Sequence, residues 1–184
     1  MIRNWYSVPL WVSEFDSAAQ QELAEHANRQ TYQQHPEWHS HGLSDPSFSG
    51  NPLEHMPETA REICTNTQEY LQALDYDSMD HTVVNSWFTC THPGEHAHIH
   101  DHPGVDISGV VYAAADSTQG DIFFPRPFDQ FGMSKLLMHW PDHYSLEPTT
   151  GRVILFPSWL KHGVRTNTSN TNRVSFSWNT VLYK

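Results

Sequence analysis

Histidine is the residue type that most clearly suggests chemistry in this sequence. The chain has 14 histidines among 184 residues, more than its 10 lysines and arginines together. Four of them, His96, His98, His100 and His102, lie at alternate positions of EHAHIHDHPG, so an extended strand would place them on one face. Neutral imidazole is a common ligand of iron, zinc and copper, and a pair at i and i+2 can take two neighbouring coordination positions. The row therefore indicates a metal site, the alternative being a solvated polar strand face.

A third ligand has to come from elsewhere in the chain, and His162 is the best candidate. It follows the strongly apolar run VILFPSWL, residues 153–160, and lies near the end of a predicted strand. In a β-barrel this position is at the mouth, where ligands commonly bind. The alternative is that His162 is a histidine of the core or rim that binds no metal. The strand that follows it in the sequence favours the interpretation of His162 as a ligand.

That next strand opens with an arginine and a serine on one face, Arg173 and Ser175. Burying a guanidinium inside a barrel is unfavourable in free energy unless it meets an anion. Its planar group can donate two hydrogen bonds to one carboxylate, and a serine hydroxyl can donate a third. The opposite face, with Val174, Phe176 and Trp178, is apolar and indicates a strand that is buried on that side. The alternative is a surface ion pair between Arg173 and one of the 21 acidic residues.

These side chains need a β-rich fold to bring them together, and the first part of the chain predicts a strand, two helices and a loop. The strand covers residues 5–13, and a helix capped by Asp16 or Ser17 follows it. Residues 33–57, rich in His, Ser, Pro, Gly and Asn without a period, predict a long loop. A second helix begins near Pro57. Its apolar side is formed by Ile63, Tyr70, Leu71 and Leu74.

From residue 81 onward the chain predicts short strands at the spacing of a sandwich or barrel. The predicted strands cover residues 82–91, 96–102, 105–115, 120–125, 152–157, 161–166 and 173–183. The connection over 126–150 is predicted to be part loop and part strand. We expect a single domain over residues 1–184, mostly β with N-terminal helices, in which residues 1–80 pack on a jelly roll or barrel formed by residues 81–184.

Charge and composition restrict the partners. The net charge of −11 argues against nucleic acid or an anionic membrane, because both are held by basic patches.

Two cysteines, Cys64 and Cys90, are too few for a disulfide framework and indicate a reducing compartment. No run approaches the ~20 apolar residues of a membrane helix, and the first residues lack the apolar region of a signal peptide. We expect a cytoplasmic protein, its oligomeric state open, with a homodimer as one option.

The order of several short motifs resembles that of the Fe(II)- and 2-oxoglutarate-dependent oxygenases. Within them the chain is most similar to a group of small oxygenases of bacteria and phages that share HxHP, SGVxY, FPSWLxH and RxSxSxN. The resemblance covers roughly residues 82–181. The motifs are here His100-x-His102-Pro103, Ser108 to Tyr112, Phe156 to His162, and Arg173-x-Ser175-x-Ser177-x-Asn179.

The resemblance implies a double-stranded β-helix, a cupin-like barrel, whose open end holds iron through His100, His102 and His162. It also implies that the far carboxylate of 2-oxoglutarate pairs with Arg173 and Ser175 and accepts a hydrogen bond from Tyr112. Three protein ligands leave three positions of an octahedron for two cosubstrate atoms and O2. The implied reaction is hydroxylation of an unactivated C–H bond, with release of succinate and CO2.

One position departs from the usual pattern of the superfamily, which is His-x-Asp or His-x-Glu. His102 stands in the second position and removes a negative charge from the site. A register shifted to Asp101 would need a histidine where the chain has Ile99. The second ligand could also be another histidine of the row, with His98 and His100 as the alternative pair.

Two other function classes stay open, as does the substrate. One class is a cupin-like metalloenzyme with three histidines and no 2-oxoglutarate, and the other is a non-catalytic metal- or carbohydrate-binding jelly roll. Arg173 favours the oxygenase, because a cupin has no need of an arginine and serine clamp. The substrate is expected to be a small molecule or peptide, with walls drawn from residues 33–57, residues 126–150 and Trp87.

Overall fold

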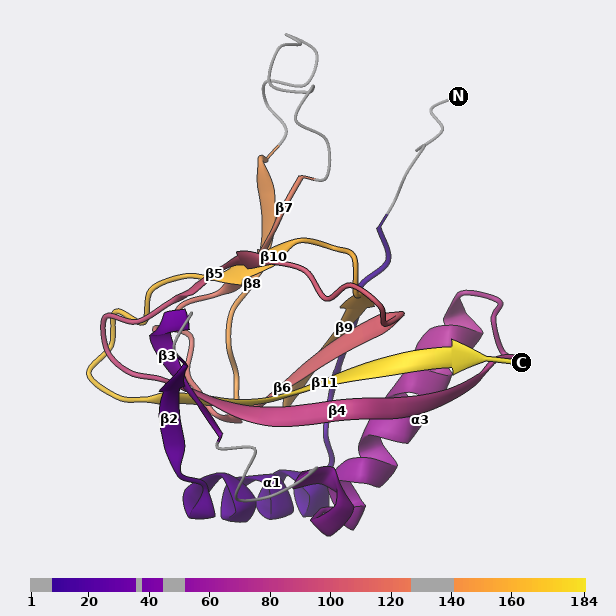
Figure 1. Ribbon diagram of the computed structural model, residues 1–184, viewed down its shortest axis with the longest axis horizontal. Helices are drawn as coiled ribbons and strands as arrows, with labels where there is room; N and C mark the ends of the chain where they lie inside the picture. The colour runs from indigo at the N-terminus through magenta and orange to yellow at the C-terminus, as the bar shows by residue number, and fades with distance from the viewer. Residues whose placement is uncertain (1–7, 36–37, 45–51, 127–140) are drawn as a thin grey trace, which may run out of the picture.

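Two antiparallel β-sheets and two α-helices make up the computed structural model (Figure 1), which describes residues 8–35, 38–44, 52–126 and 141–184. The N-terminal elements are β1 (Trp11–Glu14), α1 (Ser17–Arg29), β2 (Tyr32–His35), β3 (Trp38–Ser44), the 3-10 helix η1 (Pro52–His55) and α3 (Pro57–Ala73). Asp16 caps α1, its carboxylate accepting a hydrogen bond from the backbone N–H of Ala19 at 2.9 Å. Both predicted helices are therefore confirmed.

The remaining elements are strands, and they follow the predicted ranges closely. They are β4 (Asp80–Thr91), β5 (Ala97–His100), β6 (Ile107–Ala114), β7 (Ile122–Pro125), β8 (His143–Leu146), β9 (Arg152–Pro157), β10 (His162–Val164) and β11 (Arg173–Tyr183). The larger sheet has the order β1-β9-β6-β11-β4-β3-β2, and the smaller sheet has the order β5-β10-β7-β8. The prediction of a mostly β fold with N-terminal helices is confirmed.

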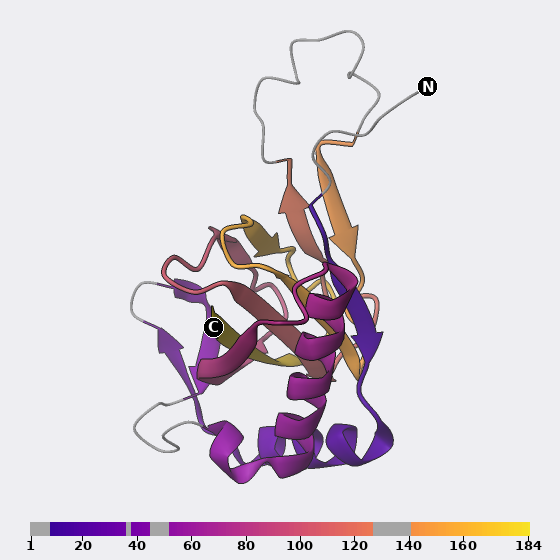
Figure 2. The same ribbon diagram turned by 90° about the vertical axis from the view of Figure 1, so that its right-hand side faces the viewer.

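Two cores lie on the two faces of the larger sheet. Both helices pack on its outer face, away from the smaller sheet (Figures 1 and 2), where Leu23 of α1 and Ile63 of α3 meet Phe176 and Trp178 of β11. The second core lies between the sheets and includes Phe156 of β9. The alternation along β11 thus directs its apolar side chains to the helices and leaves the opposite face for polar ones.

Gly109 explains part of the SGVxY motif in physical terms. It pairs with Trp178 across β6 and β11. A Cβ at Gly109 would lie 2.3 Å from the indole ring of Trp178, far inside van der Waals contact. Only glycine leaves room for this buried tryptophan beside the strand.

The prediction of a long loop over residues 33–57 is wrong in its described part, which contains β2, β3 and η1. Gly42 and Leu43 of β3 pair with Cys90 and Thr89 of β4, on the edge of β4 that β11 does not use. Strand formation here depends on pairing with a distant edge and not on local alternation, so the local composition did not reveal it. In the described residues, no helix is long and apolar enough to cross a membrane.

Candidate active site

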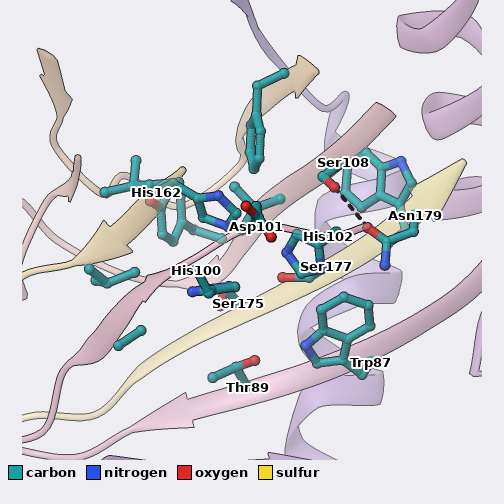
Figure 3. Close-up of a pocket in the computed structure, with 18 of the residues that line it drawn as sticks. Trp87, Thr89, His100, Asp101, His102, Ser108, His162, Ser175, Ser177 and Asn179 are labelled. Atoms are coloured by element: carbon teal, nitrogen blue, oxygen red, sulfur yellow. Dashed lines mark hydrogen bonds between the residues drawn. The ribbon is translucent and has the colours of Figure 1, made fainter. Parts of the chain in front are cut away.

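Three histidines from the smaller sheet and the turn after β5 meet in one cavity (Figure 3). His100 ends β5, His162 begins β10, and the two residues pair directly across these strands. His102 lies just beyond β5, where its backbone N–H donates to the carbonyl oxygen of Ser158 at 3.0 Å. One potential ligand atom from each imidazole lies within 4.8 Å of the others. The structure thus brings together the three predicted histidines, while their role as ligands stays a prediction.

Backbone carbonyls orient two of the rings. Nδ1 of His100 lies 2.7 Å from the carbonyl oxygen of His98, and Nδ1 of His162 lies 2.9 Å from that of Leu160. Because a carbonyl oxygen can only accept, each Nδ1 carries the proton and each Nε2 keeps its lone pair. Metal-binding histidines are typically held in this way, with one ring nitrogen bonded to a carbonyl and the other on the metal.

Burial also keeps the three imidazoles neutral. Desolvation is the largest cause that lowers the pKa of each, to about 4 for His102 and about 3 for His162, with His100 lowered as well. The neighbouring imidazole of His100 lowers the pKa of the other two further. Neutral imidazole is the form that binds metal, so the cluster is ready to bind at neutral pH without releasing protons.

Aromatic rings pack against two histidines of the cluster and contribute to their burial. The ring centroids of Phe156 and His162 lie 4.6 Å apart, and those of Trp87 and His102 lie 5.9 Å apart. His162 is only 5% exposed. The predicted position of His162 at the end of an apolar run therefore corresponds to a buried side chain at the edge of the inter-sheet core.

The expectation that the four histidines of the row face one way is wrong. His100 pairs with His162 but Ala97 pairs with Val164, so two residues of β5 oppose one residue of β10. This bulge shifts the alternation of side chains by one position. His96 and His98 consequently line a different cavity, and the alternative ligand pair of His98 with His100 is not favoured.

Arg173 is buried, with 2% of its surface exposed, and lines the same cavity as the three histidines. Its Nη1 donates to the carbonyl oxygen of Gly120 and its Nη2 to Oγ1 of Thr91, both at 2.9 Å, whereas the buried Nε has no partner. Among the described residues, no carboxylate forms an ion pair with Arg173, so the alternative of a surface ion pair is wrong. A buried guanidinium without an anion is unfavourable, so the binding of a carboxylate by Arg173 stays a prediction.

Ser175 and Tyr112 lie beside this arginine. They pair across β11 and β6, both are buried, and both line the cavity. Desolvation raises the pKa of Tyr112 to about 12, so its phenol stays neutral and can donate a hydrogen bond to an anion. The three residues predicted to bind a carboxylate are therefore brought together at one end of the cavity.

The sequence reasoning assigned no role to the polar residues at the other end. Ser177 and Asn179 continue the face of β11 that carries Arg173 and Ser175, and they line the cavity. Oγ of Ser108 donates to Oδ1 of Asn179 at 2.8 Å, the dashed line in Figure 3. Alternation from position 173 was the signal that could have identified them.

One of the three predicted substrate walls lines this cavity, and its contact with substrate stays a prediction. Trp87 lines the cavity (Figure 3), as predicted. Of the described residues in 33–57 and 126–150, none is part of its lining. Residues 36–37, 45–51 and 127–140 of these segments lie outside the described part of the chain.

Comparison with protein families gives one match. Residues 85–179, just over half of the chain, match the family described as "Putative 2OG-Fe(II) oxygenase". A search of curated proteins finds no match.

Similar solved structures have the same fold at low sequence identity. The non-heme alpha-ketoglutarate-dependent epimerase SnoN from nogalamycin biosynthesis has a TM-score of 0.69 at 11% identity, covering 95% of this chain and 76% of that chain. HygX from Streptomyces hygroscopicus, with nickel and 2-oxoglutarate bound, has 0.65 at 13% identity, with coverages of 95% and 83%. A 2OG-Fe(II) oxygenase family oxidoreductase from Burkholderia pseudomallei has 0.64 at 15% identity, with coverages of 91% and 79%. At these identities the likeness shows the fold, a double-stranded β-helix as predicted.

Proposed function

Because the chain belongs to the 2OG-Fe(II) oxygenase family, we propose that it is an Fe(II)- and 2-oxoglutarate-dependent dioxygenase. Its reaction is hydroxylation of an unactivated C–H bond in a small molecule or peptide. One atom of O2 enters the product alcohol, and the other enters the succinate formed as 2-oxoglutarate loses CO2. The single observation that carries this proposal is one cavity lined by three neutral histidines and by a buried arginine that has no acidic partner among the described residues.

The residues present fit both groups. Three imidazole nitrogens match the borderline hardness of Fe(II) and would fill one half of an octahedron. The orphaned Nε of Arg173 fits a distal carboxylate, whose charge would balance the buried guanidinium. When bound, iron and 2-oxoglutarate together supply the oxidising chemistry that no side chain of the chain can provide.

The chain's own groups bind and orient the reactants. His100, His102 and His162 would hold the metal, with the Nδ1 protons of His100 and His162 fixed on backbone carbonyls. Arg173 would bind the far carboxylate of the cosubstrate, and the hydroxyls of Ser175 and Tyr112 would donate to it. The aromatic rings beside His162 shield its imidazole from water, which strengthens the electrostatic contacts that it makes.

The other end of the cavity would receive the substrate. Arg173 and Asn179 are six positions apart on β11, about 20 Å at the usual rise of a strand. The far end is lined by Trp87, Ser177 and Asn179, a flat ring beside hydrogen-bonding groups. The cavity of about 230 Å³ is smaller than the roughly 300–1,000 Å³ of typical ligand pockets, so we expect a small polar substrate or one end of a larger one.

A cupin-like metalloenzyme is the second candidate, because the cluster holds three histidines and no carboxylate. Such an enzyme would not use 2-oxoglutarate. The burial of Arg173 beside Ser175 and Tyr112 favours the oxygenase. A site that does not bind the carboxylate of 2-oxoglutarate gains nothing from a buried guanidinium.

An assay of turnover distinguishes the 2-oxoglutarate-dependent oxygenase from the cupin-like metalloenzyme. The Fe(II) protein is incubated with O2 and candidate substrates, with and without 2-oxoglutarate, and succinate and the oxidised product are measured. We expect succinate formation that needs both metal and 2-oxoglutarate, and a product heavier by one oxygen atom. Substrate oxidation that proceeds without 2-oxoglutarate would support the cupin-like enzyme instead.

A further inference from the structure

The proposed metal site has an unusual distribution of charge. Three neutral imidazoles leave both positive charges of a divalent metal without compensation from its protein ligands. The usual His-x-Asp or His-x-Glu pattern places one negative charge directly on the metal. A site that replaces this carboxylate with His102 should bind the metal less tightly unless a negative charge lies close by.

Asp101 is the acidic residue that the fold places at this site. It lies between His100 and His102 in the turn after β5 and is drawn among the residues that line the cavity in Figure 3. Among the described residues of the lining, it is the only acid, and Arg173 is the only residue that carries a positive charge at neutral pH.

The carboxylate of Asp101 is not already used by the protein. In the described part of the chain, no hydrogen bond or ion pair involves it. It does not join the group of close ligand atoms, which contains only the three histidines.

We propose that the carboxylate of Asp101 stabilises the bound metal from outside its coordination sphere. It supplies the negative charge that the three histidine ligands lack. This inference rests on the proposed function. The carboxylate acts through space or through a water on the metal, as outer partners of metal ligands commonly do. Asp101 is exposed, so its charge is open to screening by salt.

An electrostatic role has two consequences of opposite sign. A negative charge near the metal favours binding of a divalent cation, and it opposes binding of the dianion 2-oxoglutarate to the loaded protein. Asp101→Asn removes the charge with little change in shape. We expect it to weaken Ni(II) binding roughly tenfold, the lower end of the range for outer partners, and to tighten 2-oxoglutarate binding to the Ni(II) protein by a few fold.

The test uses isothermal titration of Ni(II), then of 2-oxoglutarate, into the wild-type protein, Asp101→Asn, Asp101→Glu and Asp77→Asn. Asp77 is exposed in the turn after α3 and lies outside the cavity lining, so Asp77→Asn makes the same change in net charge at a distant place. We expect Asp77→Asn to bind like the wild type, Asp101→Glu to retain most of the Ni(II) affinity, and added salt to reduce the effect of Asp101→Asn.

Two results would overturn the inference alone. One is an Asp101→Asn protein that binds Ni(II) as tightly as the wild type. The other is a variant that loses affinity for both Ni(II) and 2-oxoglutarate, as a merely structural role would produce. A wild-type protein that binds no Ni(II) would instead overturn the proposed function, and this inference with it.

Discussion

Histidines from a single short segment fall into two groups with different surroundings. His100 and His102 join His162 in a cavity where burial lowers the pKa of each ring. His96 and His98 lie with their ring centroids 4.7 Å apart in a second cavity, which is also lined by charged residues of other segments. Among the described residues, this pair gains no third close ligand atom.

The difference between the groups shows what turns a histidine into a candidate ligand. Residue type and spacing are the same in both, but among the described residues only the first group has a third close imidazole from another strand. In the first group, Nδ1 of His100 and of His162 also bonds to a backbone carbonyl, and Phe156 packs against His162. The bulge in β5 separates the groups, because it directs His96 and His98 to the other cavity. Substitutions in the two groups should therefore have unequal effects.

The largest effect is expected for His162→Ala. Loss of one of three ligands should weaken metal binding by at least about 100-fold, since even partners outside the coordination sphere account for roughly 10- to 100-fold. His100→Ala should behave in the same way. The measurement is metal content after dialysis against limiting Fe(II), with circular dichroism to check the fold.

His96→Ala is the matched control, because it removes an imidazole from the other group. Its metal content should equal that of the wild type. If His162→Ala kept stoichiometric iron, the three-histidine cluster would not be the metal site.

Substitutions of His102 should separate the need for a ligand from the need for an imidazole. His102→Ala should lose turnover, whereas His102→Asp should keep iron and some decarboxylation of 2-oxoglutarate, because a carboxylate occupies this position in the usual pattern of the superfamily. Metal content and succinate formation are compared for both variants. Normal turnover by His102→Ala would mean that another histidine of the row is the ligand.

A smaller effect is expected for Arg173→Lys, which keeps the positive charge and loses the planar fork. Affinity of the metal-loaded protein for 2-oxoglutarate should fall roughly tenfold, about the loss of one charge-assisted hydrogen bond. Metal binding should not change. Titration calorimetry measures both affinities.

Arg165→Lys provides the comparison for the other cavity. Arg165 is exposed, and its guanidinium lies over the ring of Phe123 at 5.0 Å. Its substitution should leave 2-oxoglutarate affinity unchanged. If Arg173→Ala bound 2-oxoglutarate as tightly as the wild type, Arg173 would not be the residue that binds its far carboxylate.

The smallest change is expected from mild acidification. The pKa values of His102, about 4, and His162, about 3, lie below the value of about 6.5 in the unfolded chain. Below pH 6.5 the unfolded chain therefore binds more protons than the folded protein does. The free energy of unfolding of the metal-free protein is at its full value above this pH and decreases as the pH falls toward 4 and 3. Near pH 6 only the start of this loss is reached, because this pH lies just below the free-histidine value of about 6.5.

The same shift protects metal binding by the folded protein. Protons should compete with the metal near pH 4 and not near the free-histidine value of about 6.5. Metal titrations and urea unfolding between about pH 4 and 7.5 measure the two effects. A steep loss of metal affinity between pH 7 and 6 would contradict the burial of the cluster.

Much of the fold and site could be predicted from local patterns. Alternation along residues 173–178 indicated that Arg173 and Ser175 share a face, and the apolar run before His162 indicated a position near the end of a strand, at the mouth of the barrel. The bulge in β5 could not be predicted, because it depends on how β5 pairs with β10. The strands β2 and β3 were missed for a similar reason, since pairing with the edge of β4 stabilises a segment without a local pattern. The single-domain assignment stays a prediction.

The central claim is that one cavity holds a divalent metal and 2-oxoglutarate together. It is tested most directly by titrating 2-oxoglutarate into the protein with and without Ni(II), in the absence of any substrate. The account predicts binding of one 2-oxoglutarate per chain that depends on the metal and is weakened in Arg173→Lys. Binding that is absent with Ni(II), or equally tight without it, would contradict the account.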